Sequence, residues 1–152
     1  MRSRAHKPLL AAAGVGVLLA SASCAKSGDA SREQAVSNAA ARFHENLKAS
    51  KFEDIYAGAS PDLRAGQKKD EFIQRLRDVR ARFGELVRVE ESRFMGRAEE
   101  KEVNWVITFF DIDGASEDGS EMMAWDVSGD EIRLERYSVT FKDGKESVNL
   151  TP

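Results

Sequence analysis

The stretch VNWVITFFDI, residues 103–112, decides the fold because it separates a helical first part of the chain from a second part rich in strand signals. It consists largely of β-branched and aromatic residues, which fit a pleated sheet. An antiparallel sheet usually leaves one face to water, but here both faces are apolar, so we expect something to cover the second one. The two sets are Val103, Trp105, Ile107 and Phe109, and Val106, Phe110 and Ile112.

Before this stretch, apolar residues recur at helical spacing in three segments. Capping boxes that begin at Ser31 and Ser50 predict the first two helices, and Ser60 with Pro61 predicts the start of a short helical turn. A third helix is expected from about Lys69 to the C-cap residue Gly84. The predicted buried stripes are Val36, Ala39, Ala40, Phe43 and Leu47; Phe52, Ile55, Tyr56 and Ala59; and Phe72, Ile73, Leu76, Val79 and Phe83.

After Gly84 the apolar period changes to that of strands. Residues 86–94, 103–112, 122–127 and 131–141 are expected to form the strands of an antiparallel meander, and turn signals separate the last three. The sequence therefore predicts an α+β domain over residues 31–152, with three N-terminal helices packed on a curved, four-stranded antiparallel sheet.

Residues 40–64 (AARFHENLKASKFEDIYAGASPDLR) and 70–84 (DEFIQRLRDVRARFG), followed by the meander, resemble the nuclear transport factor 2-like, or cystatin-like, cone fold. The chain resembles in particular the small bacterial lipoprotein members of unknown function, and the resemblance covers residues 31–142. It implies a conical cavity lined by apolar side chains between the helices and the sheet. It also makes a homodimer through the outer sheet face possible, which would cover the second apolar face.

The front of the chain has the three parts of a secretory signal peptide. Residues 1–7 are basic, residues 9–20 are apolar, and the small residues 21–23 precede Cys24, which is the single cysteine. The apolar run is shorter than the roughly 18 to 20 residues that span a bilayer. We therefore expect residues 1–23 to be removed.

The cysteine behind small residues resembles bacterial lipoprotein signals, in which the thiol receives diacylglycerol and the new amino terminus is acylated, for example with palmitate. This resemblance makes Cys24 the lipid-attachment residue and residues 24–30 a flexible tether. Ala25, in the position after the cysteine, implies the outer membrane, facing the periplasm. One departure is Ser21, where the signal usually has Leu, Val or Ile. Ordinary cleavage after Ala22, which would leave a free thiol, is the alternative.

Charge and composition argue against several functions. Without residues 1–23, the chain has 20 basic against 26 acidic side chains, so it lacks the basic excess of a nucleic-acid-binding protein. His44 is the one histidine of the mature chain. We expect it at the surface or at the boundary of the core, and we predict neither a metal nor another cofactor. The acidic run DIDGASEDGSE, residues 111–121, is interpreted as a solvated hairpin turn because the EF-hand spacing is absent.

Three functional hypotheses follow. The preferred one is a membrane-anchored, non-enzymatic binding or interaction module whose cavity or sheet face meets a ligand, for example a small apolar molecule, or a partner. The second is a lyase or isomerase with an Asp/Tyr pair in an apolar cavity, drawn from Asp54, Tyr56, Asp111, Asp126 and Tyr137. The third is a structural, homodimeric envelope component. The candidate cavity residues are Phe43, Leu47, Tyr56, Phe72, Leu76, Trp105, Phe109, Trp125 and Tyr137.

Overall fold

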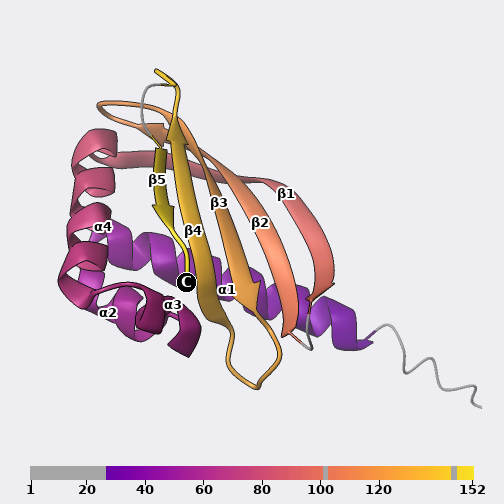
Figure 1. Cartoon of the computed structure of the whole chain (residues 1–152). Coiled ribbons are helices and arrows are strands. Elements are labelled where there is room, and N and C mark those ends of the chain that lie inside the picture. Colours follow the sequence, from indigo (N-terminus) through magenta and orange to yellow (C-terminus); the bar gives the residue numbers. More distant parts are fainter. Residues whose placement is uncertain (1–26, 101–102, 145–146) are drawn as a thin grey trace, which may run out of the picture.

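A computed structural model describes residues 27–100, 103–144 and 147–152, and in this part of the chain four helices precede an antiparallel meander (Figure 1). The helices are α1 (Ser27–Lys48), α2 (Phe52–Ala57), α3 (Pro61–Gly66) and α4 (Lys69–Phe83). The strands are β1 (Leu86–Glu100), β2 (Val103–Gly114), β3 (Gly119–Asp126), β4 (Arg133–Phe141) and β5 (Ser147–Leu150), paired in this order. The predicted α+β class is confirmed.

The structure has one helix and one strand more than we predicted. The short turn that begins at Pro61 forms α3, a full helix, and the segment after Asp143-Gly144 returns as β5. The tail was not predicted as a strand because β5 is only four residues long. It pairs with β4 from Tyr137↔Leu150 to Thr140↔Ser147, so the end of the chain completes the sheet.

The stripes of α1 and α4 were predicted correctly, because their apolar residues are buried on one face. In the stripe predicted for the second helix, Phe52 and Ile55 are buried, but Tyr56 is half-buried and Ala59 lies beyond the end of α2. In α4 the stripe Phe72, Ile73, Leu76, Val79 and Phe83 is at most 4% exposed. Gly84 then has φ 68°, a left-handed backbone that suits glycine, and its N–H bonds the Arg80 carbonyl. Ser60 caps α3 as predicted, because its Oγ accepts a 3.0 Å hydrogen bond from the Leu63 N–H.

The starts of α1 and α2 were predicted wrongly. Helix α1 begins at Ser27 rather than Ser31, so residues 27–30 of the predicted tether are helical. Ser50 does not cap α2: its φ of 57° and its N–H bond to the Leu47 carbonyl place it at the end of α1, and Lys51 takes the N-cap position.

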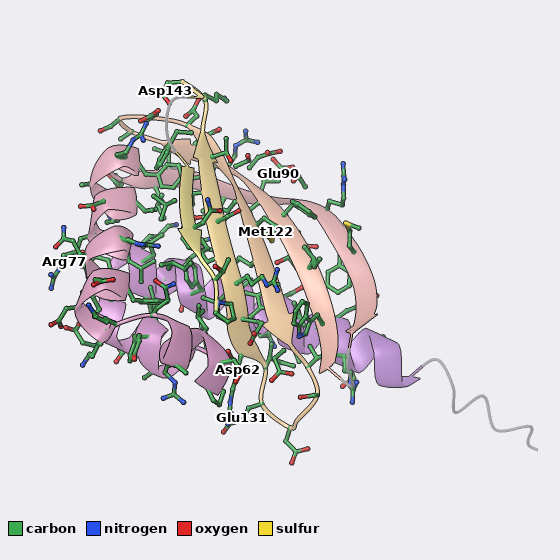
Figure 2. The ribbon with its side chains drawn as sticks, in the orientation of Figure 1. Asp62, Arg77, Glu90, Met122, Glu131 and Asp143 are labelled. Atoms are coloured by element: carbon green, nitrogen blue, oxygen red, sulfur yellow. The ribbon has the colours of Figure 1, made fainter. Side chains whose placement is uncertain are left out.

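Alternate residues of β2 face opposite sides of the sheet. Val106, Thr108, Phe110 and Ile112 are buried against the helices, and α1 crosses this face (Figure 1). The outer apolar face, which we define as Met95, Trp105, Ile107, Phe109 and Met122, lies on the other side, as the pairing of Met122 with Phe109 indicates (Figure 2). Two arginines lie against its rings: Arg93 over Phe109 at 5.5 Å and Arg136 over Trp105 at 4.8 Å.

An irregularity in β4 brings the α2–α3 connection onto the sheet. Ala124 pairs with Arg136, but the next residue, Trp125, pairs with Leu134, so one residue of β4 is bulged. Leu134 also forms an isolated parallel bridge with Ala59, and its carbonyl accepts a 2.8 Å bond from the Ser60 N–H. The start of β4 is therefore fixed between the sheet and the helices.

Candidate functional site: a buried polar cluster and an adjoining cleft

Three polar side chains meet in the apolar interior, and we call them the polar cluster: His44 of α1, Glu121 of β3 and Tyr137 of β4. The Tyr137 hydroxyl donates a 2.5 Å hydrogen bond to Glu121 Oε1, and His44 Nε2 lies 2.6 Å from Glu121 Oε2. Their exposed fractions are 5%, 1% and 0% respectively. Each carboxylate oxygen therefore has a hydrogen-bonding partner, as a buried acid requires.

Aromatic rings enclose the polar cluster. Phe43 packs on Tyr137 with 4.9 Å between ring centroids, and Phe110 lies edge-on to His44 at 4.8 Å. Burial, together with the neighbouring Glu121, raises the pKa of Tyr137 well above its usual value of 10. The phenol therefore stays protonated at neutral pH and serves as a hydrogen-bond donor to Glu121.

His44 was expected at the surface or the core boundary and Glu121 in a solvated turn, and both predictions were wrong, because both side chains are buried. Glu121 belongs to β3, which begins at Gly119, and not to the preceding turn. It alternates with Met123 and Trp125 on the inner face, and this period-two pattern is the signal that could have identified it. His44 follows Ala40 by four residues and precedes Leu47 by three, which is the spacing of the buried helical face.

A cleft opens beside the polar cluster, between α1, the α2–α3 connection and the β3–β4 hairpin. We call it the helix–hairpin cleft. In Figure 2 it lies at the end of the molecule where Asp62 of α3 and Glu131 of the hairpin are labelled. Its narrow part is about 130 Å³ and its wide part about 610 Å³, and Arg42, Gly58 and Ile132 line both. The narrow part is otherwise lined by Ala39, Phe43, Asn46, Asp54, Ile55, Trp125 and Leu134.

The charged side chains of the cleft differ in their pairing. Arg133, in the wide part, pairs with Glu131 at 2.8 Å. Within the described residues, the side chains of Arg42, Asp54 and Arg64 have no ion-pair or hydrogen-bond partner. The cleft therefore presents both signs of charge above an apolar floor.

Phe43 separates the cleft from the polar cluster. Its ring lines the narrow part of the cleft and also packs on Tyr137. Neither part of the cleft is lined by His44, Glu121 or Tyr137. A ligand in the cleft is therefore separated from the polar cluster by the side chain of Phe43.

The predicted cavity residues divide among three places. Phe43 and Trp125 line the cleft, and Trp125 is fixed there by a 2.9 Å bond from its Nε1 to Thr108 Oγ1. Leu47, Phe72, Leu76 and Tyr137 are in the closed core, and Tyr56 packs half-buried on Phe72. Trp105 and Phe109 lie on the outer apolar face, because they alternate with the inner residues of β2.

The candidate Asp/Tyr pairs are not formed. Asp54 is in the cleft, Asp111 is exposed on the outer side of β2, and Asp126 accepts hydrogen bonds from Ser128 in its own turn. The Tyr56 hydroxyl donates a 3.5 Å hydrogen bond to the Arg64 carbonyl and has no bond to an acid among the described residues. Tyr137 bonds Glu121, a residue that was not among the candidates.

Several predictions concern metals or the membrane. Among the described residues, no group of three or more His, Cys, Asp and Glu side chains is arranged to hold a metal ion. No helix in this part of the chain has the length and apolar character needed to cross a bilayer. Cys24 and the predicted signal peptide lie outside the described residues.

Comparison with known proteins adds no functional assignment. No protein-family model matches the chain, and neither a curated protein nor a solved structure matches it significantly. Function must therefore be argued from the polar cluster, the cleft and the sequence itself.

Proposed function

We propose that this is a lipid-anchored protein of the bacterial cell envelope whose folded domain is a non-enzymatic binding module. The observation that carries the proposal is the helix–hairpin cleft, where unpaired charged side chains surround an apolar floor. Small-molecule sites generally have this composition, mostly apolar with a few placed polar groups. We further propose the cone fold for the domain, supported by helices that precede an antiparallel sheet and cover one of its faces.

The proposed anchor is Cys24, in the inner leaflet of the outer membrane. The pattern of residues 1–23 and the position of the cysteine support it. Since α1 begins at Ser27, only residues 25 and 26 separate the proposed anchor from the helix. Two extended residues span about 7 Å, so the domain would be held directly at the membrane surface.

Lipidation is tested by the intact mass of protein extracted from membranes. We expect a chain that begins at Cys24 and carries a diacylglyceryl group and an amide-linked fatty acid, because two or more chains are needed for stable anchoring. Cys24→Ser should release the protein from the membrane fraction. A mature chain with an unmodified thiol would contradict the anchor and favour ordinary secretion.

The binding function is tested by filling the cleft at Gly58. The glycine has φ −81° and ψ −2°, which any residue can adopt, and an added Cβ would meet only the Asp54 and Ile55 carbonyls, at 3.5 and 3.7 Å. In a thermal-shift screen of apolar metabolites and amino acids, a ligand at a hundred times its Kd should raise Tm by on the order of 5 to 10 °C. We expect Gly58→Leu to abolish such shifts.

Gly58→Ala is the matched control, because it changes the same backbone position but adds only a methyl group. It should retain most of each shift. Ligands that stabilise Gly58→Leu as strongly as the unchanged protein would place binding elsewhere and contradict the proposal.

A homodimer through the outer apolar face is a second proposal, compatible with binding at the cleft. Met95 of this face is 45% exposed, and its four other residues are half-buried. An apolar sheet face of this kind is typical of an interaction surface. We expect Phe109→Asp to convert a dimer to a monomer in sedimentation measurements; Asp111→Asn, on the same strand, is the control. A monomer at micromolar concentration before any substitution would contradict it.

The polar cluster favours a third candidate, a cavity enzyme. Glu121 and His44 are an acid and a base of the kind that transfer protons, and they lie one ring away from the cleft. The Glu121→Gln variant distinguishes a binding module from an enzyme. In a binding module it should leave the affinity of the cleft for its ligand unchanged. In an enzyme it should abolish turnover of a bound compound.

A further inference from the structure

Two opposite charges line the narrow part of the helix–hairpin cleft without meeting. Arg42 comes from α1 and Asp54 from α2, and both face the same space of about 130 Å³. Within the described residues, neither side chain has an ion-pair or hydrogen-bond partner. Elsewhere on the surface, Arg88 with Asp113 and Lys142 with Asp118 are paired at 2.8 and 2.9 Å. The cleft therefore keeps a positive and a negative group available.

The floor between these charges is apolar and aromatic. Phe43, Ile55 and Trp125 line it and are themselves at most 6% exposed, so they are held by the core. Cavities of about 150 Å³ accept a benzene molecule, so the narrow part is large enough for a group close to the size of a phenyl ring. Asn46, half-buried in the same part, adds an amide that can donate or accept.

We propose that the cleft binds a small zwitterion with an apolar group, which is the chemistry of an aromatic or branched-chain α-amino acid. The carboxylate pairs with Arg42, the ammonium group pairs with Asp54, and the apolar side chain lies on the floor beside Trp125. Charge-assisted hydrogen bonds of this kind are the strong ones. The inference deepens the binding function proposed above and rests on it.

The charge balance of the whole cleft favours a zwitterion over a simple anion. The two parts together are lined by three arginines, Arg42, Arg64 and Arg133, and by three acids, Asp54, Asp130 and Glu131. These charges sum to zero, so the cleft has no net charge with which to attract an anion. A ligand that carries both signs can satisfy Arg42 and Asp54 together.

Three probes with the same ring test the inference: L-phenylalanine, 3-phenylpropionate, which lacks the ammonium group, and 2-phenylethylamine, which lacks the carboxylate. Each is titrated into the purified full-length protein carrying Trp105→Phe. The chain has two tryptophans, so this substitution makes Trp125 the sole indole reporter. Among the described residues, the Trp105 Nε1 has no hydrogen-bond partner. We expect saturable binding of phenylalanine and at least tenfold weaker binding of the other two.

Substitutions of Arg42 and Asp54, each with a matched control, test whether these two side chains bind the ligand. Arg42→Gln and Asp54→Asn should each weaken phenylalanine binding about tenfold, the effect of losing one charge-assisted bond. Lys48→Gln and Glu53→Gln remove the same charges from exposed positions of α1 and α2 that do not line the cleft, and they should change nothing. Equal losses in the control variants would overturn the assignment.

The failure of this inference is distinguishable from the failure of the binding function. If 3-phenylpropionate binds as tightly as phenylalanine, or if phenylalanine does not bind while other compounds give shifts that Gly58→Leu removes, the zwitterion is wrong and the binding module stands. If no compound gives a shift that Gly58→Leu removes, both are wrong.

Discussion

Replacing Glu121 with alanine is expected to lower the free energy of unfolding by about 3 to 5 kcal/mol, the cost of removing one member of a buried polar pair. The carboxylate is 1% exposed and bonds both His44 and Tyr137. Its removal leaves two buried polar groups unsatisfied and a cavity beside them. Urea denaturation followed by tryptophan fluorescence measures the loss.

Two further variants identify the cause of that loss. Glu121→Gln retains the volume and one oxygen acceptor, so it should cost less than the alanine variant, about 1 to 3 kcal/mol. Glu91→Ala removes an exposed carboxylate from β1 and should change stability by no more than about 0.5 kcal/mol. If Glu121→Ala were as harmless as Glu91→Ala, the buried position of Glu121 would be wrong.

The second large effect is expected at Phe83, where α4 ends against the sheet. Its ring is fully buried, packs on Phe141 at 4.9 Å between centroids and lies where a Cβ on Gly119 would reach it at 3.1 Å. Phe83→Ala should cost about 3 to 5 kcal/mol, through lost burial and the cavity that remains. The same denaturation measurement applies.

A conservative substitution at Phe83 and a substitution at an exposed residue are the controls for Phe83→Ala. Phe83→Leu keeps most of the apolar volume and should recover at least half of the loss. Val87→Ala, at a side chain that is 69% exposed, should be close to neutral. A small effect of Phe83→Ala would mean that α4 does not pack against β3 and β4 as described.

The parts of the fold that repeat at a regular period were predictable. The stripe from Phe72 to Phe83 specifies which side of α4 is buried. The alternation along β2 predicts a strand but not its buried side, because both sets of residues are apolar, and Trp105 and Phe109, expected in the cavity, lie on the outer face. The ends of the elements were less predictable, because local signals compete there: Ser50 has the sequence of an N-cap but ends α1. The bulge that pairs Trp125 with Leu134 depends on tertiary contacts that no local pattern contains.

The candidate site was harder to predict than the fold, because its residues are distant in the sequence. His44 and Glu121 are 77 positions apart, and only the packing of α1 on β3 brings them together. The cleft likewise combines α1, α2 and the β3–β4 hairpin. Of the nine predicted cavity residues, Phe43 and Trp125 line it, since the others were chosen for apolar character, which selects core residues equally well.

A single side chain, that of Phe43, lies between the cleft and Tyr137. The cleft lies on one side of its ring and Tyr137 on the other. An occupant that displaces the ring would therefore also move Tyr137 and the hydrogen bond that it donates to Glu121. For such an occupant alone, binding in the cleft is coupled to the buried hydrogen bonds through this single benzyl group.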